Sequence, residues 1–386
     1  MSRRAHPFAR AAGIALAASI LISLSGCSFV SNLFGPTSST PTASAPAWQS
    51  YLFMSDTNSG KIYTYDPSTH AANATSLLST GQNATGTINF YKGIGYSAVG
   101  YGAGAGVYWF DPAAANPVFT RLSTPSNTAI NAQYFAFAST SLAYVSVAGD
   151  FTNDLGGIYT FNPSNLAAGL AGPIAGTDKY LQDIAIGPDG RVYAAENLDQ
   201  QVLVYNPVNV TTTTIATSAS GTTGIRAGTL NGNPGVFVAN TGPFNPSTYL
   251  PSNGSIDFIP SNGATSSPVV PTSFSADFTP GRLIQLEVSS NLVATGNGHT
   301  WLITLSGSTA SASEIKANGT SFGSLDLAEK NGLICMPSDA TNYSVTPPTN
   351  INSLYVFDET GVMASYSPVS VMTSTDGFTN LAFYSN

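Results

Sequence analysis

The stretch LQDIAIGPDGRVYAAENLDQQVLVYNP, residues Leu181–Pro207, indicates the fold of this chain. It contains three short apolar runs, Asp183–Gly187, Arg191–Ala195 and Gln201–Tyr205. A Gly-Pro-Asp-Gly turn separates the first two runs, and the polar loop 196–200 separates the second from the third. Short apolar runs joined by turn residues are typical of an antiparallel β-meander.

The end of this meander recurs along the chain. Val-Tyr-Asn-Pro at 204–207 is matched by Tyr-Thr-Tyr-Asp-Pro at 63–67 and by Tyr-Thr-Phe-Asn-Pro at 159–163. The corresponding apolar positions are 65, 110, 161, 205, 258, 305 and 357, so their spacing runs from 44 to 53 residues. A β-rich repeat of this period is typical of a propeller in which each unit forms one four-stranded blade. We therefore predict an all-β, seven-bladed β-propeller.

The strand order predicts how the ring closes. An Asp-Pro or Asn-Pro pair ends most third strands, because proline cannot donate a hydrogen bond to a ladder. We expect fourth, outer strands at 74–78, 117–122, 211–217 and 362–366. The chain enters with a second strand at Tyr51–Ser55 and ends with a first strand at Asn380–Tyr384. The C-terminal strand is therefore expected to complete the N-terminal blade and remove its open edge.

The composition agrees with a β-rich exported protein. Charged residues make up 8% of the chain, there are 37 glycines, and β-formers such as Tyr and Phe are common. Without residues 1–26, which hold three of the 12 basic residues and no acid, 9 basic residues face 20 acidic ones. This balance argues against nucleic acid as a partner, because binding phosphates needs a basic face.

The N-terminus predicts the cellular address. Three arginines precede an apolar run, Ala11–Leu24, that is too short for a good membrane span. The run ends in Leu-Ser-Gly-Cys, which resembles the lipobox of bacterial lipoproteins, so 1–26 is expected to be a signal peptide and Cys27 the lipidated residue. Fatty acyl chains such as palmitate on Cys27 would hold the protein at the membrane of the cell envelope. Ser28 rather than an aspartate follows, which favours the outer membrane in a Gram-negative host.

The domain boundaries follow from the predicted signal peptide and lipidation site. Residues 27–48 comprise the lipidated Cys and a Ser/Thr/Pro-rich tether, and 49–386 form the seven-bladed propeller, expected to be monomeric.

The best-formed unit resembles a known superfamily. Asp183–Asn197 shows an apolar strand, a Pro-Asp-Gly turn, a Val-Tyr strand and an acidic residue at its end, as in NHL, YVTN and lactonase-like propellers. The resemblance implies the propeller fold but no single function, since such blades occur in proteins with unrelated functions. In lactonase-type members, a Ca²⁺ ion held in the channel by acidic and amide side chains polarises an ester. Here the candidate calcium ligands would be Asp183, Glu196, Asn240 and Asp56.

Polar residues gather where the loops of a propeller open on one face, which we call the mouth face. It receives the ends of the second strands and the starts of the first strands. The second strands end at Asp56, Asp150, Glu196, Asn240, Asn297 and Asp339. The first strands start at Asn89, Gln133, Asp183, Arg226, Arg282, Asp326 and Asn380. We predict a binding site at this channel mouth formed by Asp56, Asp150, Asp183, Glu196, Arg226, Asn240, Arg282, Asn297 and Asp339.

Two interpretations of these polar residues stay open. They converge on a cation such as Ca²⁺ or on a polar ligand, or they satisfy the backbone of their own loops. The long loop Asn240–Gly254, which carries Phe244 and Tyr249, either packs locally or contacts a sugar or a protein.

Three functional hypotheses follow. The first is a non-catalytic, lipid-anchored module whose mouth face binds a protein or a glycan. The second is a Ca²⁺-dependent lactonase or esterase of the propeller type. The third is a structural subunit of an envelope assembly.

Overall fold

The structure of the propeller comes from a computed structural model. It describes residues 50–386 apart from 57–58, 74, 80, 82–84, 101, 126–127, 150–155, 178, 248–249, 308, 325, 338–340, 343–348, 351–352, 366, 371–377 and 386. The predicted signal peptide, Cys27 and the tether lie outside the described residues. The described residues form one compact unit. No helix in the described part of the chain is long and apolar enough to span a membrane.

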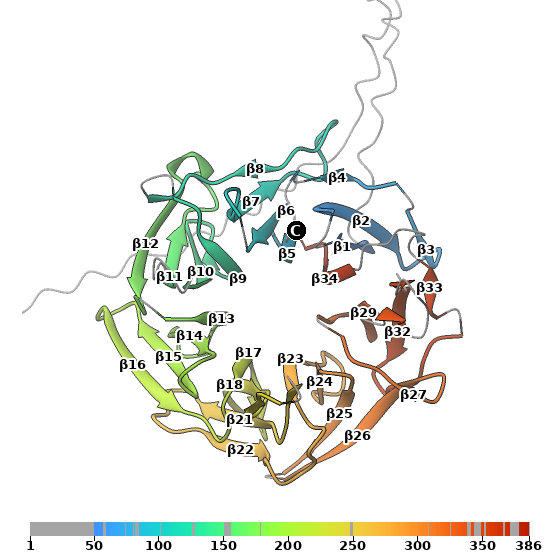
Figure 1. Ribbon diagram of the computed structural model, residues 1–386. Helices are drawn as coiled ribbons and strands as arrows, with labels where there is room; N and C mark the ends of the chain where they lie inside the picture. Colours follow the sequence, from blue (N-terminus) through green and yellow to red (C-terminus); the bar gives the residue numbers. More distant parts are fainter. Residues whose placement is uncertain are drawn as a thin grey trace, which may run out of the picture. The chain divides into compact units, whose positions relative to one another are not determined.

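Seven antiparallel sheets are arranged around a central axis, each forming one blade (Figure 1). Blade one contains β1 (Leu52–Asp56), β2 (Lys61–Asp66), β3 (Ala71–Ala72), β4 (Leu78–Ser79) and β34 (Phe378–Phe383). Blade two contains β5 (Thr85–Tyr91), β6 (Ile94–Val99), β7 (Gly106–Phe110) and β8 (Thr120–Arg121). Blade three contains β9 (Asn131–Ser139), β10 (Leu142–Ala148), β11 (Gly157–Phe161) and β12 (Leu170–Ala175), with a 3-10 turn, η3 (Leu166–Ala168), before β12. Blade four contains β13 (Leu181–Ile186), β14 (Val192–Glu196), β15 (Gln201–Asn206) and β16 (Thr211–Ala216).

The last three blades carry additional short strands. Blade five contains β17 (Thr222–Leu230), β18 (Asn233–Asn240), β21 (Ser255–Pro260) and β22 (Ser267–Val270), and its loop holds the hairpin of β19 (Phe244–Asn245) and β20 (Leu250–Pro251). Blade six contains β23 (Pro280–Gln285), β24 (Leu292–Gly296), β25 (Thr300–Ser306), β26 (Thr309–Ala317) and β27 (Thr320–Ser321). Blade seven contains β28 (Ala328–Lys330), β29 (Leu333–Pro337), β32 (Ser353–Asp358) and β33 (Val369–Ser370), with β30 (Thr341–Asn342) and β31 (Thr349–Asn350) in its loop.

The C-terminal strand closes the ring, as the sequence predicts. β34 pairs antiparallel with β1, with Leu52 opposite Phe383 and Met54 opposite Leu381. Tyr384 adds an aromatic contact to blade two, its ring centroid 5.2 Å from that of Phe90. β1 thus lies between β2 and β34, so the inner edge of β1 is paired.

The core lies between the blades, because each blade is covered on both faces. In β14, Val192 and Ala194 pack in a cluster with Tyr144 and Ile158 of blade three. Tyr193 and Ala195, which point to the other face of the strand, pack in a cluster with residues of blade five such as Val236 and Val238. A strand buried on both faces needs a continuous apolar run, which is what β14 shows.

The Pro-Asp-Gly turn also joins two blades. The Asp189 carboxylate accepts hydrogen bonds from the Tyr193 hydroxyl (2.8 Å) and from the backbone N–H of Asn262 in blade five (2.8 Å). Gly190 follows at φ +76°, a backbone conformation that favours glycine.

The outer strands fit the predictions less well. The segment 211–217 forms β16 up to Ala216, and 117–122 contains β8. In blade one, however, the predicted strand 74–78 is wrong, because the outer edge is divided into β3 before it and β4 at its end. In blade seven, 362–366 makes only a bridge between Met363 and Phe357, and the outer strand is β33. The Ser367-Pro368 bond precedes β33, and a proline there has no N–H for the ladder.

Candidate functional site: a polar network across the channel

The innermost strands place polar side chains around the axis. Tyr134, Asp183 and Arg282 belong to blades three, four and six. In each of these blades, the residue that follows along the chain pairs with the central residue of the second strand. The three residues therefore occupy equivalent positions near the mouth end of their strands.

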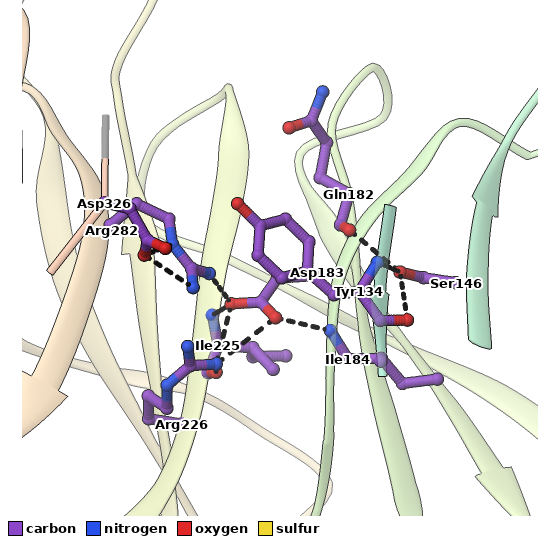
Figure 2. Close-up of polar contacts among 9 residues, drawn as sticks. All are labelled: Tyr134, Ser146, Gln182, Asp183, Ile184, Ile225, Arg226, Arg282 and Asp326. Atoms are coloured by element: carbon purple, nitrogen blue, oxygen red, sulfur yellow. Dashed lines mark hydrogen bonds and ion pairs between the residues drawn. The ribbon is translucent and has the colours of Figure 1, made fainter. Parts of the chain in front are cut away.

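Asp183 is the centre of the network (Figure 2). Its side chain is 1% exposed and forms ion pairs with Arg226 Nη1, at 3.0 Å, and with Arg282 Nη1. It also accepts backbone hydrogen bonds from Ile184 (2.8 Å) and from Ile225 of blade five (3.0 Å). Both carboxylate oxygens of Asp183 are thus used within the protein.

Arg282 connects the network to blades three and seven. Its Nη2 donates to Asp326 Oδ1 at 3.2 Å, and its Cζ lies 4.1 Å from the ring centroid of Tyr134. Burial disfavours the charged guanidinium, but Asp183, Tyr134 and Asp326 outweigh this effect and raise the pKa of Arg282. Burial also raises the pKa of the Tyr134 hydroxyl.

The network reaches the two remaining blades at its ends. Asp326 Oδ2 accepts the backbone N–H of Leu381 in blade one at 3.1 Å. In blade two, Thr87 lies near the Tyr134 hydroxyl. The ion pairs, the hydrogen bonds and the ring contact of the network therefore join the innermost strands of blades one, three, four, five and six and the residue entering blade seven across the axis.

A glycine in blade five allows Arg282 to reach Asp183 in blade four. Gly224 precedes Ile225, and a Cβ at this position would lie 2.8 Å from the carbonyl oxygen of Gly281 and 3.4 Å from Cα of Arg282. Blades five and six therefore approach closely here, and the absence of a side chain on Gly224 makes this approach possible.

Two cavities adjoin the network on the side away from the mouth. The larger, about 420 Å³, follows the inner strands from Tyr134 to Phe137 and from Asp183 to Ile186. The smaller, about 340 Å³, is lined by the network's Arg282 and Asp326 and by Glu287 and Glu329. Asn89 and Arg226 line both cavities, so the two meet at these residues. Volumes of this size lie within the range of roughly 300–1,000 Å³ typical of small-molecule sites.

Three predicted site residues are occupied by hydrogen bonds within their own blades. Asp56 accepts two hydrogen bonds from Ser59, and Glu196 accepts from the backbone of Asp199 (3.1 Å) and from Gln201 (3.2 Å). The Asn240 amide accepts from Thr222 and donates to Ser255, both at 2.9 Å. All three are at most 1% exposed. For Asp56 and Glu196 the structure therefore agrees with the interpretation that they satisfy loop groups.

The candidate calcium ligands have separate partners in this arrangement. Asp56 and Glu196 bind their own loops, and Asn240 binds side chains of β17 and β21. Asp183 is bound by two arginines. Among the described residues, no group of three His, Cys, Asp or Glu side chains is placed to hold a metal ion. The calcium site stays a prediction that no contact in the described part of the chain supports.

The other predicted residues divide into three groups. Asp183, Arg226 and Arg282 come together in the network. Asn297 is exposed at the mouth, and Asp150 and Asp339 lie outside the described residues. The sequence reasoning missed Tyr134 and selected its neighbour Gln133, which instead hydrogen-bonds Asn131. Aligning the inner strands so that Asp183 and Arg282 match places Tyr134 at the same position.

Comparisons with known proteins support the fold. No family model matches the sequence, and no curated protein is similar enough to count as a relative. A functionally unknown protein from Desulfotomaculum acetoxidans has 11% identity and a TM-score of 0.60, with 86% of this chain and 98% of that chain covered. A protein from Bacteroides fragilis, provisionally assigned as a 6-phosphogluconolactonase, has 12% identity and a TM-score of 0.60, with 87% and 98% covered.

The dihydro-heme d1 dehydrogenase NirN has 11% identity and a TM-score of 0.56, with 87% of this chain and 75% of that chain covered. Identities this low show a shared propeller fold, including lactonase-like neighbours, and carry no function to this chain.

Proposed function

We propose that this protein is a lipid-anchored, non-catalytic propeller of the cell envelope whose mouth face binds a protein partner. The observation that carries the proposal is a group of exposed apolar side chains on the mouth-face loops of three successive blades. We call this group the mouth apolar patch. Its members are Leu198 (59% exposed), Phe244 (59%), Leu250 (48%) and Phe274 (39%). Phenylalanine and leucine side chains exposed on one face favour a protein contact there, whereas exposed apolar residues of the opposite face, such as Val208 and Val362, are valines.

The loop that carries Phe244 and Leu250 is held firmly at its base. On one side, the backbone N–H of Gly242 donates to Ser220 at 2.9 Å. On the other side, the N–H of Asn253 donates to Ala276 at 3.0 Å. These bonds connect the loop to the segments entering blades five and six. A base that is fixed before binding lowers the conformational entropy lost when a partner binds.

The network favours a structural role for the buried charges. Asp183, Arg282 and Asp326 are nearly fully buried and occupied with one another, which suits a rigid support for the mouth-face loops. The lipid on Cys27 and the tether of 27–48 would confine this face to the envelope, where a partner in the same membrane is encountered often.

A photo-crosslinking amino acid at Phe244 tests the proposal in cells of the host. The matched control is the same substitution at Val208, which is 92% exposed in the turn between the third and fourth strands, on the opposite face. We expect a discrete protein adduct from position 244, none from position 208, and loss of binding to the purified partner in Leu250→Asp. Equal labelling from both positions, or glycan binding to the purified protein without any protein adduct, would overturn it.

A further inference from the structure

Arg226 has one edge of its guanidinium group unused. All three of its hydrogen bonds in the described structure come from Nη1, which donates to both oxygens of Asp183 and to the carbonyl of Ile225 at 2.8 Å. Nε and Nη2 donate to no described residue, and the side chain is 31% exposed. These two nitrogens form the side-on edge that binds a carboxylate through two parallel hydrogen bonds.

A second polar group without a partner lines the same cavities. Asn89, on β5 of blade two, is half-buried, and its amide makes no hydrogen bond to any residue that the structure describes. Arg226 comes from blade five, so the two residues reach the channel from different parts of the ring. Polar groups that line a cavity generally have a hydrogen-bond partner. For Arg226 and Asn89 this partner would be a ligand or water.

The charges of the network restrict what this ligand can be. Arg226 and Arg282 balance Asp183 and Asp326, so the unused edge of Arg226 can accept one negative group. Apart from the network, Glu287, Glu329 and Lys330 line the smaller cavity and add one net negative charge, which disfavours a second anionic group. The larger cavity has apolar side chains, among them Phe137 and Ile186, that can contact an apolar body.

We propose that Arg226 and Asn89 form a site for a small molecule with a single carboxylate and an apolar body. The carboxylate accepts hydrogen bonds from Nε and Nη2 of Arg226 and from the Asn89 amide. The apolar body lies in the larger cavity along β9 and β13. This site is separate from the mouth apolar patch, so the two proposals can fail independently.

Binding of simple carboxylates to the full-length protein in a neutral detergent tests the site. The probes are phenylacetate, hexanoate and inorganic phosphate, with phenylacetamide as the uncharged counterpart of the first. The readout is the ¹³C-methyl NMR signal of Ile186, which lines the larger cavity. We expect phenylacetate or hexanoate to shift this signal in a saturable manner, and phenylacetamide and phosphate to leave it unchanged.

Substitutions on the two sides of the site provide the controls. Asn89→Ala leaves the ionic network intact and should weaken carboxylate binding about tenfold, and Arg226→Gln should weaken it more. Arg191→Gln removes an arginine that is paired with an aspartate away from the channel, and Asn297→Ala removes an exposed mouth asparagine. Neither should change binding. The proposal is overturned if no carboxylate binds at about 10 mM, which is ten times the dissociation constant of roughly 1 mM of a weak ligand. It is also overturned if Asn89→Ala and Arg226→Gln bind like the wild type.

Discussion

The guanidinium group of Arg282 lies over the ring of Tyr134, with Cζ 4.1 Å from the ring centroid, although the residues belong to blades six and three. The same guanidinium binds Asp183 of blade four and Asp326 at the entrance to blade seven. One side chain thus contacts three other blades across the axis. A propeller depends on contacts between neighbouring blades, and this arginine adds contacts between distant ones.

Arg282→Met should therefore destabilise the fold strongly. It leaves the buried Asp326 without its ion-pair partner and Asp183 with only Arg226, and such a loss typically costs about 3–5 kcal/mol. Urea denaturation measures the free energy of unfolding. The matched control is Lys179→Met, which breaks an ion pair with Asp199 whose side chains are 32% and 51% exposed and should cost at most about 1 kcal/mol. Equal effects of the two substitutions would contradict a structural role for the network.

Gly224→Ala should separate blades five and six. The added methyl group would lie 2.8 Å from the carbonyl oxygen of Gly281, a backbone atom that cannot move alone. We expect a loss of about 1–3 kcal/mol in the free energy of unfolding. Gly281→Ala is the control, because its Cβ would have no neighbour nearer than 3.7 Å and should change stability by at most about 0.5 kcal/mol. A neutral Gly224→Ala would show that the close approach is not needed.

Glu196→Gln should raise the melting temperature at neutral pH. Burial is the main cause that raises the pKa of Glu196 above its ordinary value of 4.5. A raised carboxyl pKa means that the folded state favours the protonated form of Glu196. The contribution of Glu196 to the free energy of unfolding is therefore present below the unfolded pKa and is lost as the pH rises through the folded pKa. The gain from the neutral glutamine should therefore shrink as the pH falls toward the unfolded value.

Asp66→Asn should lower the melting temperature at neutral pH, which is the opposite of the effect of Glu196→Gln. The hydroxyl and N–H of Ser68 hydrogen-bond the Asp66 carboxylate and lower its pKa. The contribution of the Asp66 carboxylate to the free energy of unfolding is present above the unfolded pKa and is lost as the pH falls through the folded pKa. Melting curves between neutral and acidic pH should show this variant below the wild type at pH 7, with the difference disappearing in acid. The same pH trend for both variants would contradict these assignments.

Deletion of residues 378–386 should abolish cooperative folding. The deletion removes β34 and Tyr384, and it exposes the inner edge of β1 as well as Phe53 and Phe90, which Tyr384 contacts. We expect aggregation in gel filtration and no sharp thermal transition. Tyr384→Leu keeps the strand and should retain a cooperative transition at a lower temperature. A deletion variant that still melts cooperatively would show that the other six blades hold the ring closed.

Most of the fold follows from local sequence signals. The third strands end in Asx-Pro pairs or apolar-aromatic repeats, and the first and last strands each lack a partner that the other supplies. The outer strands are harder to predict, because they are short and largely exposed. In blade seven the segment with the expected pattern makes only a bridge through Met363.

The site is less predictable for a different reason. The position of Asp183 and Arg282 on inner strands follows from the repeat, but their contact spans 99 residues and depends on the missing side chain at Gly224. Tyr134 sits in the aromatic run Tyr-Phe-Ala-Phe, which indicates core packing and conceals a residue that faces the axis. Glu196 and Asn240 have the residue types of metal ligands, but the loop of Glu196 and the strand before Asn240 provide partners that the sequence pattern does not reveal.

The position of β1 between β2 and β34 also determines how the domain bears mechanical load. The chain that precedes Tyr51 leads directly into β1, which is hydrogen-bonded along both sides. A pull along this strand must shear two ladders at once instead of peeling a free edge one bond at a time. Tension applied through the N-terminal segment therefore acts on one of the best-supported strands of the ring, and the blade that contains both ends of the propeller resists being drawn apart.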